Sequence, residues 1–389
     1  MKITKRQFIL GVGATLAQPA LVRAQAGEDI RIGATVPLSG PAAAYGAAGL
    51  AMDAYFSMIN EQGGINGRKI KLLLADDGFT PNRTLEQTRR LVEGEKVLFM
   101  LGQVGTSTSL AARQYLNDAK VPQLFVSSGA PTWLDDIQKY PWSLSVQPTY
   151  VAEGRRVAEH ILATRPNAKV GALYLNDDAG KGFVRGVREV LAQRPGMLVK
   201  EQTTENSEPT VDSQVIALQA SGADTMVCFA IPRSTSQAIR RASEMQWNPQ
   251  IYLSTVGTSI QQALVPAGLE RSKGVIAAAY MKDPTDSEWA NDAAVQAVIA
   301  NIKKYQPKAS LDASMSVGTT CAHLATQVLR QCGREITRDN VLAQTMALDL
   351  APAMLVPGLR VKTSPNQRAV VSSVRLQQFD GTNWKLMKA

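Results

Sequence analysis

Two short polar loops carry residues whose types and spacing suit the binding of a small anion. The first reads LGQVGTSTS over residues 101–109 and opens a helical pattern, and the second reads VSSGAP over residues 126–131; both follow apolar runs. Glycines let the backbone approach a ligand, hydroxyls cap a helix start, and free N–H groups of a first helical turn attract negative charge. The loops therefore predict a cradle for a carboxylate, with two ordinary capped turns as the alternative.

A serine nucleophile is the other chemistry that the second loop could support. Ser127 or Ser128 would then need a neighbouring base. The chain has only two histidines, His160 and His323, and each lies in an amphipathic helical pattern that is typical of core or surface positions. A hydrolase that uses one of these serines therefore remains as an alternative function without an obvious base.

Three pairs of adjacent aspartates could act as acid and base or hold a divalent cation. They stand at 76–77, 135–136 and 177–178, at the ends or starts of expected elements. Aspartates in such places commonly cap turns and helices, and we expect that role here. Neither polar loop has the Lys-Ser/Thr of a phosphate-binding loop, so nucleotide binding is disfavoured, and we expect no cofactor or metal.

The elements that position these loops alternate regularly between strand and helix. Strands are expected at 30–36, 69–75, 96–101, 122–126 and 142–146, and, after the pattern restarts, at 169–175, 197–201, 224–229 and 250–253. Helices are expected between them at 45–60, 81–93, 107–119, 151–164, 181–193, 211–220 and 235–245. Such alternation predicts an α/β fold with two doubly wound parallel-sheet lobes. The two polar loops then emerge at carboxyl ends of neighbouring strands, where ligands bind.

The C-terminal third departs from this alternation. Long helical patterns cover 289–305 and 313–330, and short strands are expected at 359–361, 369–378 and 384–387, the last two joined by the Asp380–Gly381 turn. No low-complexity linker is visible. Any crossing between the lobes is therefore expected in short ordered segments.

The N-terminal 26 residues have the pattern of a signal peptide. A basic start is followed by an apolar stretch at 8–20 and by Ala24-Gln25-Ala26, a small-x-small cleavage pattern. The segment fits an ordinary secretory or a twin-arginine-like signal, so we expect a periplasmic protein. Removal of residues 1–26 lowers the formal charge from +9 to +5. This modest, scattered excess does not indicate nucleic-acid binding, and we expect a monomer.

Several segments resemble the leucine/isoleucine/valine-binding protein family, the type I periplasmic receptors of ABC importers. They are IGATVPLSG at 32–40, Tyr45-Gly46, GGINGRKI at 63–70, and Asp76-Asp77. The resemblance spans essentially the whole mature chain. It implies a receptor rather than an enzyme, which delivers a small molecule to an ABC permease in the inner membrane. It also implies two hinged lobes, an N-terminal one of 29–150 plus 279–355 and a C-terminal one of 151–278 plus 356–389.

The resemblance also implies a ligand site in the cleft between the lobes. Tyr45 resembles the aromatic residue that covers the ligand, and Thr106 and Ser127 resemble the residues whose backbone N–H and hydroxyl groups hold its carboxylate. The turn at 177–179 falls on the facing wall. The predicted ligand-binding residues are Tyr45, Gln103, Thr106, Ser127, Ser128, Gly129, Tyr150, Ile231 and Val256.

Departures from the family pattern bear on the ligand class. Val256 stands where amino-acid binders place an acid, and Gly129 and Ala179 replace a hydroxyl residue and a tyrosine. An ammonium group buried without a counter-charge costs several kcal/mol. We therefore expect a small carboxylate without an amine, an aromatic acid or a keto acid. The alternative is a hydrophobic amino acid paired with Asp177 or Asp178, and a role in sensing also stays open.

Overall fold

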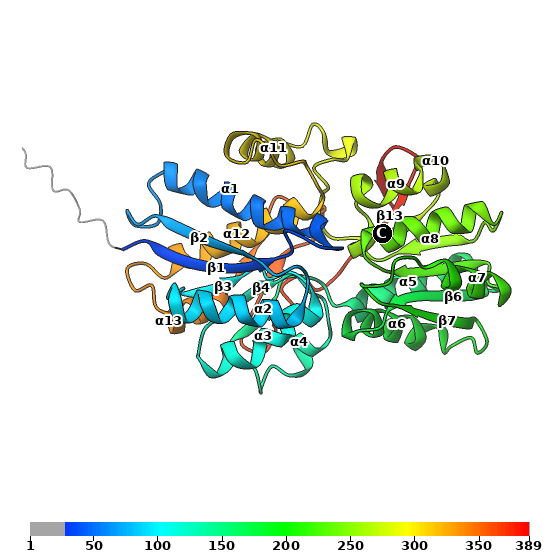
Figure 1. Ribbon diagram of the computed structural model, residues 1–389, viewed down its shortest axis with the longest axis horizontal. Helices are drawn as coiled ribbons and strands as arrows, with labels where there is room; N and C mark the ends of the chain where they lie inside the picture. Colours follow the sequence, from blue (N-terminus) through cyan, green and yellow to red (C-terminus); the bar gives the residue numbers. More distant parts are fainter. Residues whose placement is uncertain (1–27, 389) are drawn as a thin grey trace, which may run out of the picture.

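The computed structural model describes residues 28–388. The signal peptide expected at 1–26 lies outside these residues. Two α/β lobes lie next to each other along the long axis of the molecule, and the chain passes between them in short segments (Figure 1). The predicted fold class is confirmed, since each lobe has a wholly or mainly parallel sheet with helices on both faces.

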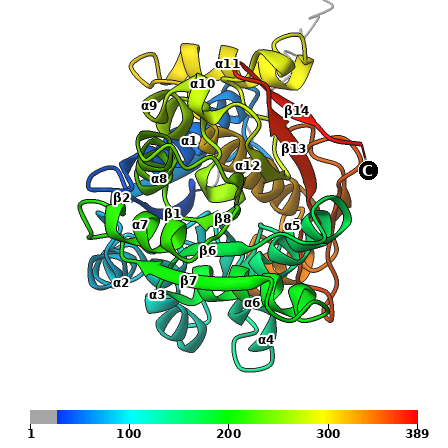
Figure 2. The ribbon, with the colours of Figure 1, turned by 90° about the vertical axis from the view of Figure 1, so that its right-hand side faces the viewer.

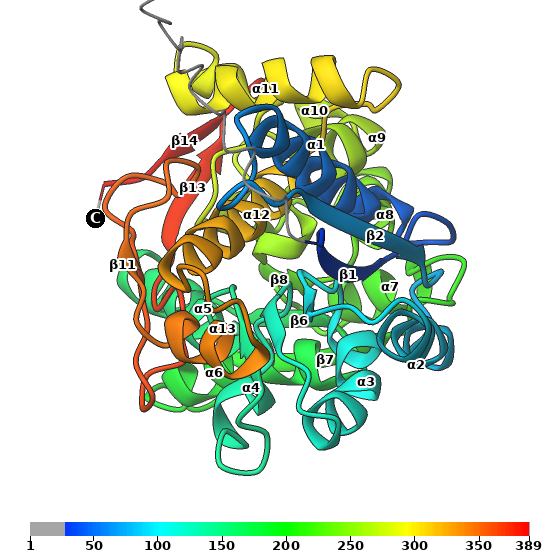
Figure 3. The same ribbon diagram turned by 90° about the vertical axis from the view of Figure 1, so that its left-hand side faces the viewer.

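The first lobe contains a five-stranded parallel sheet in the order β2-β1-β3-β4-β5. Its strands are β1 (Ile30–Val36), β2 (Ile70–Asp76), β3 (Phe99–Leu101), β4 (Gln123–Val126) and β5 (Ser143–Ser145). The apolar residues of β1 pack with α1 (Ala47–Glu61) and α12 (Ser314–Gln331) in the main core. The opposite face carries α2 (Pro81–Arg89) and α3 (Thr106–Asp118), while α11 (Ala293–Tyr305) packs outside α1 (Figure 3).

The second lobe contains a seven-stranded sheet in the order β14-β13-β10-β9-β8-β6-β7. Its strands are β6 (Val170–Leu175), β7 (Leu198–Thr204), β8 (Thr225–Phe229), β9 (Gln250–Leu253), β10 (Ile276–Ala279), β13 (Arg375–Phe379) and β14 (Trp384–Leu386). Helices α5 (Tyr150–Thr164) and α6 (Asp178–Leu191) cover one face, and α7 (Asp212–Ala220) and α8 (Pro232–Glu244) the other. The antiparallel hairpin β13–β14 forms one edge (Figure 2).

Both sheets reverse their strand order at an equivalent place. In the first lobe the reversal lies between β1 and β3, and in the second between β6 and β8. In doubly wound sheets, ligands bind at such a switch point, outside the carboxyl ends of the strands. The loops after these strands therefore define the ligand-binding region of each lobe.

Several elements were not expected from the sequence. The strand β10 is an alanine-rich buried segment of four residues, too short to show a strand period. The chain between β9 and β10 forms short turns of helix rather than one element, and residues 90–94 continue α2 as a π-helical turn. Three further elements, α4 (Thr132–Asp135), α13 (Arg338–Thr345) and β11 (Asp349–Leu350), are also short.

The last crossing from the first lobe to the second was expected at residue 356 but lies further along the chain in the structure. Strand β12 (Val361–Lys362) pairs with β11, and Val370 and Val371 pack in the core of the first lobe. The chain enters the second sheet only at Arg375, where β13 pairs with β10. The last crossing therefore lies just before Arg375, because the valines of 361–371 bury their side chains against the first lobe.

Candidate functional site

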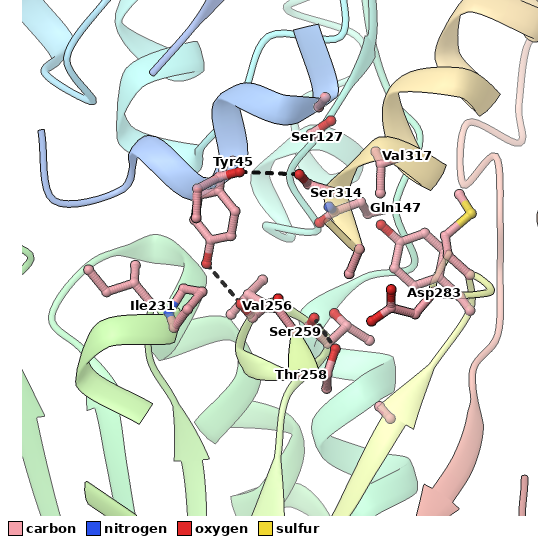
Figure 4. Close-up of a pocket in the computed structure, with 18 of the residues that line it drawn as sticks. Tyr45, Ser127, Gln147, Ile231, Val256, Thr258, Ser259, Asp283, Ser314 and Val317 are labelled. Carbon is pink, nitrogen blue, oxygen red and sulfur yellow. Dashed lines mark hydrogen bonds between the residues drawn. The ribbon is translucent and has the colours of Figure 1, made fainter. Parts of the chain in front are cut away.

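A cavity of about 140 Å³ lies between the two lobes. Its first-lobe wall comes from the loops after β1, β3 and β4, and its second-lobe wall from the loops after β6, β8 and β9. The segment between β10 and α11 and the start of α12 complete it. Figure 4 shows Tyr45 and Ser127 facing this space from the first lobe and Ile231, Val256 and Ser259 from the second.

Six of the nine predicted residues line this cavity. They are Tyr45, Thr106, Ser127, Tyr150, Ile231 and Val256. They come from both lobes and from six separate segments of the chain, so the tertiary fold brings them together. Whether each of them contacts the ligand stays a prediction.

The other three predicted residues do not line the cavity, which corrects the sequence-based expectation. Gln103 is fully buried behind the loop, where its amide donates to Thr35 Oγ1 at 2.8 Å. The hydroxyl of Ser128 points into the core and accepts from Trp133 Nε1 at 2.9 Å. At Gly129 a Cβ would come within 2.2 Å of the Pro148 carbonyl oxygen, so this position demands glycine for close packing.

The carboxylate cradle is built from the start of α3 and from Ser127. Gly105 precedes α3 with a φ of +97°, and no side chain of the described residues caps the helix, contrary to the expectation that the loop hydroxyls would. The first N–H groups of α3 therefore have no partner within the helix. The hydroxyl of Ser127 is buried without a hydrogen-bond partner in the described part of the chain.

The backbone N–H of Ser127 was expected to hold the ligand carboxylate, but it is already used within the protein. The backbone N–H of Ser127 donates to the Gln103 carbonyl at 2.8 Å, so only the Ser127 hydroxyl is available to a ligand. The hydroxyl of Thr106 is shared with Ser128 Oγ at 2.6 Å. The polar groups that this wall can offer to an anion are therefore the Ser127 hydroxyl and the first turn of α3.

Aromatic side chains form much of the remaining wall. Tyr45 reaches across the cleft and donates from its hydroxyl to the Val256 carbonyl at 2.8 Å (Figure 4). Burial raises the pKa of Tyr45, so this hydroxyl is a neutral donor. The ring of Tyr150 packs edge-on against Phe229 at 4.7 Å between centroids, and Phe79 also lines the cavity. Flat walls of this kind suit an apolar or aromatic ligand body.

Four aspartates also line the cavity, and three of them were missed in the sequence. They are Asp177, Asp283, Asp286 and Asp312. Asp177 is the N-cap of α6, as expected for that pair of aspartates. Burial raises the pKa of Asp283 to about 7, against an ordinary value of 3.8. The wall therefore contains acids, although none stands at Val256.

Two sequence signals could have located the missed acids. The apolar run VIAAAY at 275–280 contains a strand and is followed by MKDPTD, and residues after a strand end belong to the ligand face of such a sheet. Asp312 precedes α12 and accepts from the Ser314 N–H at 2.8 Å, a helix-start pattern that is readable from D-x-S.

The histidines lie away from the cavity. The ring of His160 is hydrogen-bonded to the Tyr252 hydroxyl at 3.0 Å, and that of His323 to the Tyr55 hydroxyl at 2.9 Å. Neither is among the cavity-lining residues, so neither can serve Ser127 as a base. Within residues 28–388, no three His, Cys, Asp or Glu side chains are grouped so that they could hold a metal ion.

A comparison with protein families decides what kind of molecule this architecture represents. Residues 29–383 match the model of a family described as periplasmic binding protein. The chain belongs to the periplasmic binding protein family. This family consists of solute-binding proteins of ABC transporters that are exported to the periplasm, and not of enzymes. The hydrolase alternative is therefore wrong, and the resemblance to the leucine/isoleucine/valine-binding family is confirmed.

Individual relatives agree with this assignment. The chain is 24% identical over 288 residues to "Leu/Ile/Val-binding protein homolog 7" of Brucella suis, which covers 72% of the chain and 70% of the relative. A possible leucine/isoleucine/valine-binding protein from Rhodopirellula baltica has a similar structure, with a TM-score of 0.81, 20% identity and coverage of 93% and 96%. So does an ABC-transporter solute-binding protein from R. palustris in complex with benzoate, with a TM-score of 0.77, 17% identity and coverage of 92% and 95%.

Among residues 28–388, no helix combines the length and the apolar character that crossing a bilayer requires.

Proposed function

We propose that this periplasmic binding protein binds a small organic carboxylate in the cavity between its lobes and delivers it to an ABC permease. The observation that carries the proposal is the buried hydroxyl of Ser127, which has no partner within residues 28–388, next to the uncapped start of α3. A buried hydroxyl without a partner is costly unless a ligand uses it. A carboxylate also suits the positive end of a helix dipole.

The size and shape of the cavity favour a compact ligand with an apolar body. Its volume of about 140 Å³ is close to the ~150 Å³ of an apolar cavity that accepts benzene. Tyr45 and Tyr150 offer ring faces and edges for an aromatic or branched group. The benzoate complex of the R. palustris protein supports an aromatic acid as the first candidate and a keto acid as the second.

A hydrophobic amino acid is the second candidate function. The names of the relatives favour it, and so does Asp283. The segment around Val256, residues 251–269, contains no acid to pair with an amine. Asp283 reaches the wall from the segment between β10 and α11 and offers a carboxylate there instead.

A ligand panel in a thermal-shift assay tests the proposal. Benzoate, phenylpyruvate and 4-methyl-2-oxopentanoate are compared with phenylalanine and leucine, because a ligand of the folded state raises the melting temperature as RT ln(1 + [L]/Kd). We expect the acids to raise the transition more than the amino acids. A response to the amino acids alone would support the second candidate, and no response to any carboxylate would refute both.

Transport is distinguished from sensing by uptake. Cells that lack this protein should take up the identified radiolabelled ligand more slowly than cells that contain it. Equal uptake in both would exclude delivery to a permease as its role.

A further inference from the structure

Asp283 is the aspartate of the cavity with an unused oxygen. Its Oδ1 accepts from the backbone N–H of Thr285 at 2.8 Å and from the Thr285 hydroxyl at 2.7 Å. Its Oδ2 has no hydrogen-bond partner among residues 28–388, and the side chain lines the cavity. Figure 4 shows Asp283 across this space from Tyr45.

The other aspartates of the wall use both of their oxygens within the protein. Asp177 accepts from the N–H groups of Ala179 and Gly180 and from the Ser107 hydroxyl. Asp312 accepts from Ser314 and, at 2.9 Å, from the Ser259 hydroxyl. Asp286 accepts from the N–H groups of Glu288 and Trp384. These three therefore have structural partners, and Asp283 is the one left to face a ligand.

Among the described residues that line the cavity, no cation neutralises Asp283. Lys282 lines the cavity too, but its ammonium group donates to Asp292 at 2.6 Å. Burial and the nearby Asp312 carboxylate both raise the pKa of Asp283, which shows that its charged form is poorly stabilised in the protein alone. A hydrogen-bond donor on the ligand would stabilise the charged form of Asp283, whereas a second ligand carboxylate placed beside it would be repelled.

We propose that Asp283 selects the ligand by accepting, at Oδ2, a hydrogen bond from a hydroxyl or ammonium group that the ligand carries apart from its carboxylate. This inference rests on the proposed function, because it assumes that a carboxylate occupies the cradle at Ser127. The cavity then recognises a small acid at two chemically different walls. Within the proposed class, the preferred ligand is an aromatic acid that carries a hydroxyl or aminomethyl substituent on its ring.

Matched ligand pairs test this on the full mature protein by isothermal titration calorimetry. Benzoate is compared with 3- and 4-hydroxybenzoate and with 3- and 4-(aminomethyl)benzoate, so the two series separate a hydroxyl from an ammonium donor. We expect at least one substituted acid to bind about tenfold more tightly than benzoate. Asp283→Asn should reduce that advantage to less than about threefold and change the Kd of benzoate little.

The asparagine variant keeps an oxygen for Thr285 and replaces Oδ2 with a donor, so its unliganded melting temperature reports whether it folds. Asp283→Ala is measured alongside it, in case the amide disturbs the turn. Asp212→Asn is the matched control, because Asp212 is exposed on α7 and does not line the cavity. It should leave every Kd unchanged.

The inference is overturned if no substituted acid binds better than benzoate, or if the advantage survives in both Asp283 variants. These outcomes leave the proposed function intact, because benzoate still binds. If neither benzoate nor any substituted acid binds, the proposed function fails and this inference fails with it.

Discussion

The adjacent residues Ser127 and Ser128 have different roles, because their side chains point to opposite sides of the loop. Ser127 lines the cavity and its hydroxyl has no partner among residues 28–388, whereas the Ser128 hydroxyl is held in the core by Trp133 and Thr106. Successive side chains at the end of an extended strand point to opposite sides. The segment SSG therefore supplies one residue to the ligand wall and one to the packing behind it.

Ser127→Ala is expected to weaken binding of the carboxylate ligand by about 1–3 kcal/mol, because it removes a donor to a charged group. It should change the unfolding temperature of the free protein little, since the hydroxyl has no partner there. Ser234→Ala is the control, because Ser234 is another buried, unpartnered serine outside the cavity. Calorimetry and thermal unfolding check both effects; unchanged affinity would remove Ser127 from the site.

Tyr45→Phe tests the hydrogen bond that joins the lobes. The variant keeps the ring but removes the hydroxyl that donates to the Val256 carbonyl. A hydrogen bond of this kind contributes about 0.5–1.5 kcal/mol, so ligand affinity should fall up to about tenfold. Tyr55→Phe removes a hydroxyl that bonds to His323 within the first lobe and should leave affinity unchanged. Equal effects of the two variants would contradict a role in closure.

At the scale of elements, α5 and the loop after β9 are joined by a buried carboxylate. Glu153 on α5 accepts from the Thr255 N–H at 2.6 Å and from the Thr255 hydroxyl at 3.0 Å. Val256, whose carbonyl bonds to Tyr45, follows directly in this loop. Burial raises the pKa of Glu153 to about 7, although these hydrogen bonds act in the opposite direction.

This raised pKa predicts a pH dependence of stability. The folded protein holds the proton of Glu153 more tightly than the unfolded chain, whose pKa is near the ordinary 4.5. Its contribution is therefore fully present below about pH 4.5 and is lost as the pH rises to about 7. In Glu153→Gln the melting temperature should fall less between pH 5 and pH 7 than in the parent protein. Parallel pH profiles would show that Glu153 does not titrate in this range.

At the scale of the whole molecule, α6 of the second lobe also contacts the loops of the first lobe. The Ser107 hydroxyl donates to Asp177 at 3.3 Å, and Gly182 of α6 faces Pro131 of the first lobe so closely that a Cβ would come within 2.8 Å of the proline ring. A ligand that contacts both lobes adds its own contacts to these and so favours the closed arrangement of the lobes.

Gly182→Leu should therefore hold the lobes apart. We expect small-angle scattering to show a smaller radius of gyration for the parent protein with ligand than without it, and a smaller change for the variant, whose affinity should also fall. Ala192→Leu is the control, because it adds the same side chain at the exposed far end of α6. An unchanged radius in the parent protein, together with full affinity in the variant, would contradict closure.

Much of the fold was predictable because its signals are local. The strand at 30–36 and the helices that begin near 81 and 151 follow from apolar periods and from a proline at a first helical turn. The strand β10 was not predictable, because four buried residues show no period. The crossing before Arg375 depends on which lobe the valines of 361–371 pack against, which no local pattern states.

For the site, the sequence by itself determined that two glycine- and serine-containing loops follow neighbouring strands, and so that Thr106 and Ser127 share one wall. Only the tertiary structure decided which hydroxyl is free, where Tyr45 meets the second lobe, and that Asp283 enters the cavity. The physical reason is that strand period and turn chemistry act over a few residues. The free acceptor of Asp283, in contrast, depends on partners from segments that meet only after both lobes have packed.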